Sequence, residues 1–199
     1  MNSIKQIEVL LADRLVGRLA LTKEGLCAFE YAPDWLGSGF SISPFELPLR
    51  SGVFIAKPRP FEGGFGVFDD CLPDGWGLLI LDRYLQQKGI NPRALTLLDR
   101  LALVGSSGRG ALEFRPDHSV VTRQDYADFE KLALEAERIL DSDEYKGEGI
   151  EEFQDRGGSP GGARPKIFAR YEGKEWLVKF RAKRDPQSIG VDEYRYSLL

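Results

Sequence analysis

The residues whose types and spacing could do chemistry lie toward the C-terminal end of the chain. A glycine-rich segment, GGSPGGARPK, runs from Gly157 to Lys166, and Lys179 follows it near the end of a short apolar run. Successive backbone N–H groups in such a loop can bind phosphate oxygens, and a lysine on a neighbouring strand can contact the same phosphates. The pattern therefore indicates a nucleotide site. The Walker sequence GxxxxGK[ST] is absent, which disfavours a P-loop NTPase.

A β-hairpin would position Lys179. The apolar segments 166–170 and 176–180 flank a turn over residues 171–174, which is typical of two paired strands. Alternation along the second strand divides its side chains into a set that packs a core and a set that faces the loop. The first set is Trp176, Val178 and Phe180, and the second is Leu177, Lys179 and Arg181.

A glutamate could orient this lysine. We expect a helix from Val191 onward, with Glu193 one turn in, where its carboxylate could pair with Lys179. Protein-kinase-like folds bind ATP by this order of glycine loop, strand lysine and helix glutamate. Each feature alone has a simpler explanation: a common turn, a solvated lysine at a strand end, and a glutamate that compensates a helix dipole. Their order together favours the nucleotide site.

The charge distribution fits an anionic ligand at this loop. The chain has a net charge of -4, yet basic residues outnumber acidic ones between Arg156 and Arg184. Such a segment would attract phosphate, although a solvated basic surface explains it equally well. Direct binding to DNA is not expected, because the whole chain is acidic and its basic segment coincides with the predicted phosphate site.

Composition limits the remaining possibilities. With 199 residues and 42% hydrophobic content, the chain can form one large or two small domains with true cores. Two cysteines without a CxxC pattern and a single histidine make a disulfide framework or a zinc site unlikely, so we expect no metal ligands in this chain. We expect neither a membrane span nor a secretory signal, and hence a cytoplasmic protein.

The rest of the chain reads as a mixture of strands and helices. Apolar runs at residues 7–11, 15–21 and 26–31 predict an antiparallel meander, and a further strand is expected at 111–114. Helices are expected from Pro73 to Gly89 and from Pro92 to Gly105. A capping box at 122–125 predicts a third helix, with an acidic, mobile connector over 141–149 behind it. Its apolar stripe comprises Tyr126, Phe129, Leu132, Ala133, Ala136, Ile139 and Leu140.

Several motifs resemble the HipA family of bacterial serine/threonine kinases. They are the block FDDCLPDGWG over 68–77 with Leu81-Asp82-Arg83 behind it, the segment GSSGRGAL over 105–112, and the loop SPGGARPK over 159–166. The resemblance implies an α+β fold. A small N-terminal antiparallel β unit with helices would occupy residues 1–118, and the start of a kinase-like N-lobe, with glycine loop and β-hairpin, would occupy 119–199. Within the block we expect Trp76 in a core and Arg83 on the surface.

The resemblance also implies roles for individual residues. Ser159 matches a loop serine that such kinases can autophosphorylate, Lys179 matches the ATP lysine, and Glu193 matches the acid that follows it. The implied ATP-binding set is Gly158, Ser159, Gly161, Gly162, Ala163, Lys166 and Lys179. The catalytic aspartate and the aspartate that binds Mg²⁺ are expected beyond residue 199, so we expect no catalytic residue here and an inactive chain by itself.

The function implied is that of a toxin in a toxin–antitoxin pair. The complete kinase would use ATP and Mg²⁺ to phosphorylate a protein on serine or threonine. Its partner would be a small DNA-binding antitoxin of the HipB type, through which alone it would reach DNA. An alternative is a non-catalytic regulatory or binding module, such as a split-kinase partner or an antitoxin-like subunit. A dinucleotide fingerprint over 105–110 is disfavoured, because it follows a helix and lacks the GxGxxG order.

Overall fold

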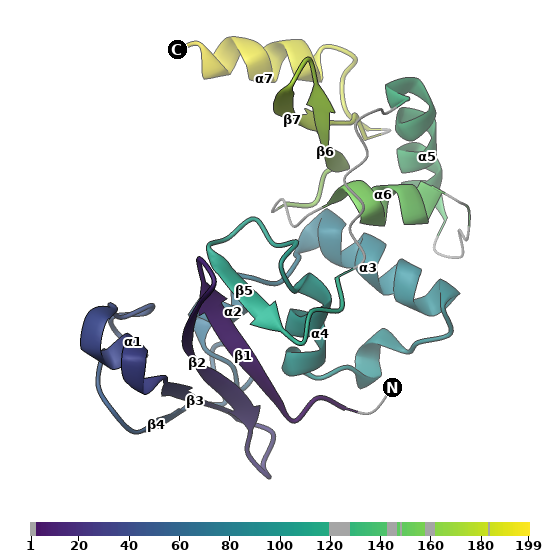
Figure 1. The fold of residues 1–199 in the computed structure, drawn as a ribbon. Coiled ribbons are helices and arrows are strands. Elements are labelled where there is room, and N and C mark those ends of the chain that lie inside the picture. The colour runs from purple at the N-terminus through teal and green to yellow at the C-terminus, as the bar shows by residue number, and fades with distance from the viewer. Residues whose placement is uncertain (1–2, 120–127, 143–146, 148, 158–161, 183) are drawn as a thin grey trace. The chain divides into compact units, whose positions relative to one another are not determined.

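The computed structural model describes residues 3–119, 128–142, 147, 149–157, 162–182 and 184–199. The chain forms two compact units, one of residues 1–72 and 91–120 and the other of residues 73–90 and 121–199. Each unit mixes strands and helices (Figure 1), in agreement with the expected α+β fold. The domain ranges expected from the sequence, 1–118 and 119–199, differ from this division because residues 73–90 pack within the second unit.

The first unit is built on a five-stranded antiparallel sheet of order β4-β3-β2-β1-β5. Its strands are β1 (Gln6–Leu11), β2 (Arg14–Leu21), β3 (Cys27–Tyr31), β4 (Val53–Ile55) and β5 (Leu112–Arg115). The predicted meander is therefore confirmed as β1 to β3, and the strand expected near residue 112 is β5, which pairs with β1.

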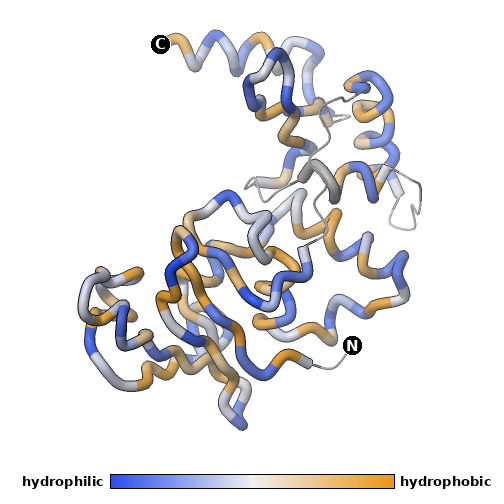
Figure 2. Tube along the Cα trace, in the orientation of Figure 1, coloured by the Kyte–Doolittle hydropathy of each residue, from blue (hydrophilic) through white to orange (hydrophobic). Residues whose placement is uncertain are grey.

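One face of this sheet carries the core. Along β1 the side chains of Ile7 and Val9 are buried, while Gln6 and Glu8 point outward. A register shift follows, because Val9 pairs with Gly17 and Leu10 with Leu15, so Val16 is an extra residue on β2. The two successive residues of this bulge, Val16 and Gly17, are both buried. Figure 2 shows the corresponding change between hydrophilic and hydrophobic positions along these strands. The largest side chains of this core are aromatic: Phe29, Trp35, Phe68 and Phe114.

Short helices complete the first unit: α1 (Pro33–Ser38), α2 (Gly66–Asp69), a 3₁₀ turn (Pro92–Ala94) and α4 (Leu97–Val104). The continuous helix expected from Pro92 to Gly105 is wrong in its first part. Thr96 interrupts it, since its hydroxyl accepts from the Asp99 amide while the Asp99 carboxylate accepts from the Thr96 amide, at 3.2 and 3.0 Å. This capping box starts α4 only at Leu97.

The second unit contains α3 (Gly75–Gln87), α5 (Phe129–Asp141), α6 (Gly149–Gly157), the strands β6 (Lys166–Tyr171) and β7 (Lys174–Lys179), and α7 (Ile189–Ser197). Its core joins Trp76 and Ile80 of α3 to side chains of α5, α6 and the hairpin. The helix and hairpin predicted around the lysine are confirmed as β6, β7 and α7. Helix α6 was not predicted, because its acidic sequence after the connector lacks a long apolar stripe.

Two details of α5 differ from expectation. The predicted capping box and Tyr126 lie outside the described residues, and the helix has Asp128 as its N-cap, with its carboxylate accepting from the Lys131 amide at 3.0 Å. Leu132, Ala136 and Ile139 are buried as predicted. Phe129 and Leu140 are instead 38% and 39% exposed, because they lie at the edges of the stripe.

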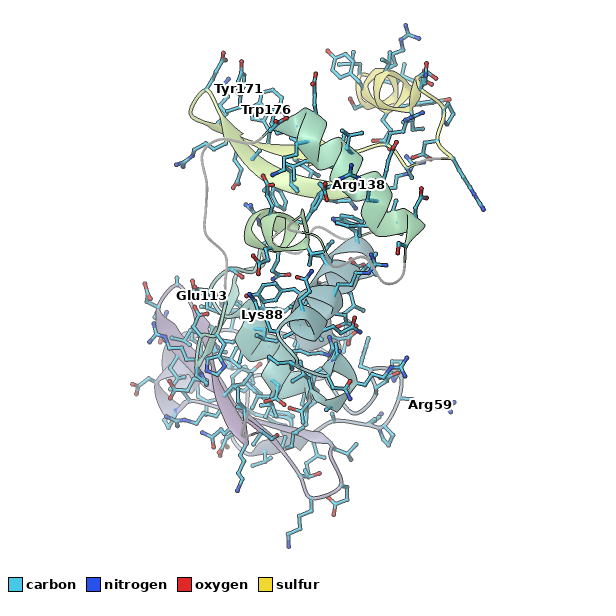
Figure 3. All side chains as sticks on the ribbon, turned by 90° about the vertical axis from the view of Figure 1, so that its right-hand side faces the viewer. Arg59, Lys88, Glu113, Arg138, Tyr171 and Trp176 are labelled. Atoms are coloured by element: carbon cyan, nitrogen blue, oxygen red, sulfur yellow. The ribbon has the colours of Figure 1, made fainter. Side chains whose placement is uncertain are left out.

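Arg83 and Trp176 correct two further expectations. Arg83 is buried rather than on the surface, and its Nη1 donates to the carbonyl of Ile139 at the end of α5. Trp176 is 52% exposed rather than packed in a core. It lies with Tyr171 toward the turn of the hairpin (Figure 3), away from the strand ends at Ile167 and Phe180 that enter the core.

No helix in the described part of the chain is long and apolar enough to cross a membrane.

Candidate nucleotide-binding site

The hairpin places two lysines side by side next to the glycine loop. Lys166 and Lys179 are direct partners across β6 and β7, so their side chains leave the same face of the hairpin. Lys166 Nζ donates to the carbonyl of Gly162 at 3.3 Å, which identifies this face as the one toward the described end of the loop. The amide of Phe180 donates to the carbonyl of Pro165 at 2.8 Å and attaches the loop end to β7.

Lys179 forms the ion pair that its spacing from Glu193 predicts. Its Nζ lies 2.8 Å from Glu193 Oε2, and both side chains remain partly exposed, by 48% and 39%. The hydrogen bond and charge of Lys179, with a smaller contribution from Arg164, lower the pKa of Glu193. Glu193 is therefore ionised at neutral pH, and it holds an accessible ammonium beside the loop.

Lys166 differs from Lys179 in its surroundings. Its side chain is buried. Burial lowers the pKa of Lys166, and the positive charge of Lys179 lowers it further, while Asp74 and Glu193 act in the opposite direction. Lys166 binds the loop itself through its hydrogen bond to the Gly162 carbonyl. Lys179 is the more accessible cation of the two.

Residues at the start of helix α3 also bind Gly162. The Gly162 amide donates to Asp74 Oδ1 at 3.0 Å, and the Trp76 amide donates to the Gly162 carbonyl at 3.1 Å. Gly75, between them, has φ +45, and a Cβ there would lie 2.6 Å from the Gly162 carbonyl atoms. Only glycine allows this approach. Trp76 is buried as expected and packs edge-on against Phe153.

We call these contacts of Asp74, Gly75 and Trp76 with Gly162 the clamp. Sequence reasoning missed it. It assigned the block over 68–77 to the N-terminal unit and saw no partner for it. The available signal was an Asp-Gly pair directly before a helix, where the glycine permits close approach of another backbone.

Arg164 is a further residue whose role sequence reasoning missed. Its Nη1 donates to Glu193 Oε1 at 3.0 Å, and its Nη2 donates to Asp185 Oδ1 at 3.1 Å. The other oxygen of Asp185 accepts from the Ala182 amide at 3.0 Å, which closes the turn after β7. The sequence shows an arginine inside the loop and two later acids, but nothing in the spacing shows that both acids return to it.

The remaining predicted ligands fall into two groups. Gly162 and Ala163 are exposed at the described end of the loop, where backbone groups can reach a ligand. Gly158, Ser159 and Gly161 lie outside the described residues. Among the described residues, no three His, Cys, Asp or Glu side chains gather as ligands for a metal ion.

The other glycine-rich segment, over 105–110, is anchored by an aspartate. Gly105 has φ +50, and a Cβ there would meet the Asp117 carboxylate. Asp117 Oδ2 accepts from the Ser106 amide at 3.0 Å and from its hydroxyl at 2.6 Å. Burial by itself would raise the pKa of Asp117, but the hydrogen bonds from Ser106 and Ser119 outweigh it and lower the pKa to about 2. These contacts give the segment a structural role.

A comparison with known families assigns the chain. A family model described as the HipA N-terminal domain matches residues 7–115, which is more than half of the chain. The protein therefore belongs to the HipA family. The match includes the sheet of the first unit and helix α3 with its Asp74-Gly75-Trp76 sequence, whereas the glycine loop, Lys179 and Glu193 follow the matched region.

Proposed function

We propose that this chain is the N-terminal portion of a HipA-like serine/threonine protein kinase that binds ATP between its glycine loop and Lys179. The observation that carries the proposal is the ion pair of Lys179 with Glu193, on the hairpin face from which Lys166 reaches Gly162. A half-exposed ammonium with a fixed carboxylate partner is suited to a phosphate, because its position is set before the ligand binds.

The residues present fit a triphosphate. Lys179 would contact phosphate oxygens, the exposed backbone at Gly162 and Ala163 would approach them, and Glu193 would keep the ammonium in place. Lys166, Asp74 and Trp76 would hold the loop itself. ATP would supply the transferred phosphoryl group. In the complete kinase, residues outside these 199 would carry out catalysis and most of the Mg²⁺ binding, and Ser159 would be the residue that is autophosphorylated.

The wider role follows from the family. HipA proteins are associated with kinase function and generally pair with a HipB antitoxin. We infer that the complete protein is the cytoplasmic toxin of such a pair, phosphorylates a protein substrate, and reaches DNA only through the antitoxin.

Calorimetric titration of the complete protein with MgATP tests the nucleotide site. Lys179→Ala should weaken binding by roughly 10- to 100-fold, the value of one charge-assisted hydrogen bond. Lys174→Ala is the matched control, because Lys174 is an exposed lysine at the other end of β7. Equal affinities of wild type and Lys179→Ala would contradict the proposal.

Phosphotransfer needs a separate assay. The complete protein should transfer label from γ-labelled ATP to itself, at Ser159, or to a substrate protein, and Ser159→Ala should abolish labelling at that site. A protein that binds its antitoxin but neither binds nor hydrolyses ATP would favour the regulatory alternative.

A further inference from the structure

We propose that Arg164 is a positioning residue that couples the glycine loop to the Lys179–Glu193 pair. The inference rests on the proposed nucleotide site and deepens it. Arg164 directly follows the exposed Gly162-Ala163 end of the loop, and it lies two residues before Lys166 at the start of β6. Any displacement of the loop therefore displaces the arginine as well.

Glu193 is shared between two cations. Its Oε1 accepts from Arg164 at 3.0 Å, and its Oε2 accepts from Lys179 at 2.8 Å. Because each oxygen has a different partner, the carboxylate cannot rotate without losing one of them. Arg164 thus fixes the orientation in which Glu193 presents Oε2 to Lys179. Charge-assisted hydrogen bonds of this geometry are among the strong ones in proteins.

The same guanidinium also fixes the turn between β7 and α7. Its second nitrogen holds Asp185, and Asp185 in turn caps the turn after β7 by accepting from the Ala182 amide. The carboxylate of Asp185 is only 15% exposed, so this bridge is better shielded from water than the pair with Glu193. Arg164 therefore links the loop, the turn and the helix through one planar group.

Polar bridges matter here because α7 has no buried side chain among the described residues. An amphipathic helix is normally held by its apolar face. In this structure Arg164 and Lys179 instead both form ion pairs with one side chain of α7, the carboxylate of Glu193. Of the ion pairs that the described residues make with Glu193, only the one with Lys179 would remain without Arg164.

This arrangement has a consequence for ligand binding. A phosphate that engages Lys179 competes with Glu193 for the same ammonium. Arg164 keeps Glu193 in place during that competition, so the carboxylate still orients Lys179 when the ligand is bound. Removal of Arg164 should therefore lower affinity for MgATP through Glu193, and not through a contact of its own with the nucleotide.

Titration of the complete protein with MgATP tests the coupling. Arg164→Ala should bind roughly 5- to 30-fold more weakly than wild type. Arg164→Lys should recover only part of this loss, because one ammonium cannot bridge two carboxylates in the manner of a guanidinium. Arg195→Ala is the matched control, since Arg195 is an exposed arginine on α7. The affinity of this variant for MgATP should stay within about twofold of wild type.

A double-mutant cycle distinguishes positioning from direct contact. If Arg164 acts through Glu193, then Arg164→Ala combined with Glu193→Gln should bind MgATP no more weakly than Glu193→Gln alone. If the two substitutions instead weaken MgATP binding by factors that multiply in the double variant, the inference is wrong. Wild-type affinity in Arg164→Ala would also overturn it while leaving the proposed function intact, whereas wild-type affinity in Lys179→Ala would overturn the proposed function.

Hydrogen exchange without nucleotide provides a second measurement. The amides of α7 should exchange faster in Arg164→Ala than in wild type, and the amides of β6 should be unchanged, which also establishes that the variant folds. Unchanged exchange in α7 would overturn the inference regardless of nucleotide affinity.

Discussion

The amide of Gly162 donates a hydrogen bond to Oδ1 of Asp74 at 3.0 Å, although 88 residues separate them in the sequence. The Trp76 amide returns a second bond to the Gly162 carbonyl. The start of α3 and the described end of the glycine loop are thus one structural element within the second unit. Asp74 and Trp76 belong to the family-matched part of the chain, whereas Gly162 follows it, so the clamp ties the loop to a region whose family is established.

Loss of the Asp74 carboxylate should loosen the loop without unwinding α3. Asp74 precedes α3 but makes no side-chain cap bond to it, and its carboxylate instead accepts from the Gly162 amide. Asp74→Ala should lose about 1 kcal/mol of the interaction that holds Gly162 and weaken MgATP binding by a corresponding ~5-fold. Calorimetry measures the affinity, and hydrogen exchange at Gly162 measures the loop.

Asp74→Asn is the matched variant, because its amide oxygen can still accept from Gly162. It should retain most of the affinity. If Asn and Ala lower affinity equally, then the charge of Asp74, and not its hydrogen bond, is responsible.

Gly75→Ala should disrupt the clamp far more than an equally strained substitution elsewhere. Gly75 is the first residue of α3 and Gly89 follows its C-terminal end, and both have positive φ, +45 and +74. A Cβ at Gly75 would lie 2.6 Å from the Gly162 carbonyl, whereas one at Gly89 meets nothing within 4 Å. Gly89→Ala should cost about 1 kcal/mol of backbone strain, and Gly75→Ala about 2 to 4 kcal/mol, because overpacking adds to the strain.

Urea unfolding of both variants measures these costs. Their difference isolates the contact with Gly162, since both substitutions place alanine at a positive φ. Equal stabilities would mean that the loop moves aside at little cost and that the clamp is weak.

Local patterns predicted the elements that carry the site. Alternation and turn residues were sufficient for the β6–β7 hairpin and for the first three strands, because a half-buried strand imposes a period of two on its own sequence. The spacing of Lys179 and Glu193 was also informative, since a strand end and a following helix bring them together through a short connection.

Contacts between distant segments could not be predicted in this way. Arg83 donates to Ile139, 56 residues away, and burial of an arginine depends on a carbonyl that no local pattern reveals. The same holds for Asp74 with Gly162. Exposed Trp176 shows the converse limit: alternation assigns its face correctly, but the core ends before the turn of the hairpin.

Arg83→Ala should destabilise the second unit. The buried guanidinium satisfies the carbonyl of Ile139 in the last turn of α5, and its removal leaves that carbonyl without this donor. We expect a loss of about 2 to 3 kcal/mol in unfolding free energy. Gln86→Ala is the control, because Gln86 is an exposed residue of the same helix, and it should change stability by less than about 0.5 kcal/mol. Urea unfolding followed by tryptophan fluorescence measures the loss, with Trp35→Phe and Trp176→Phe present in all variants so that the signal comes from Trp76 in this core.

Asp117 should make the stability of the first unit depend on pH in the acid range. Its pKa falls from 3.8 to about 2 on folding, because the hydrogen bonds from Ser106 and Ser119 outweigh the effect of burial. The unfolded chain therefore binds a proton that the folded chain does not, so the contribution is complete above about pH 4 and is lost as the pH falls toward 2.

The carboxylate is exposed, so solvent screening limits this contribution to about 1 kcal/mol. Unfolding free energies of wild type and Ser106→Ala, measured between pH 6 and pH 2, test it. Ser106→Ala removes the 2.6 Å hydroxyl donor to Asp117, so its loss of unfolding free energy relative to wild type should be largest above pH 4 and should shrink on acidification.

Ser107→Ala is the control, because the Ser107 hydroxyl donates to the Val104 carbonyl and not to Asp117. The loss of unfolding free energy in this variant should not vary with pH in this range. If the unfolding free energy of Ser106→Ala stays below that of wild type by a constant amount down to pH 2, then protonated Asp117 holds the Gly105 turn as well as the carboxylate does.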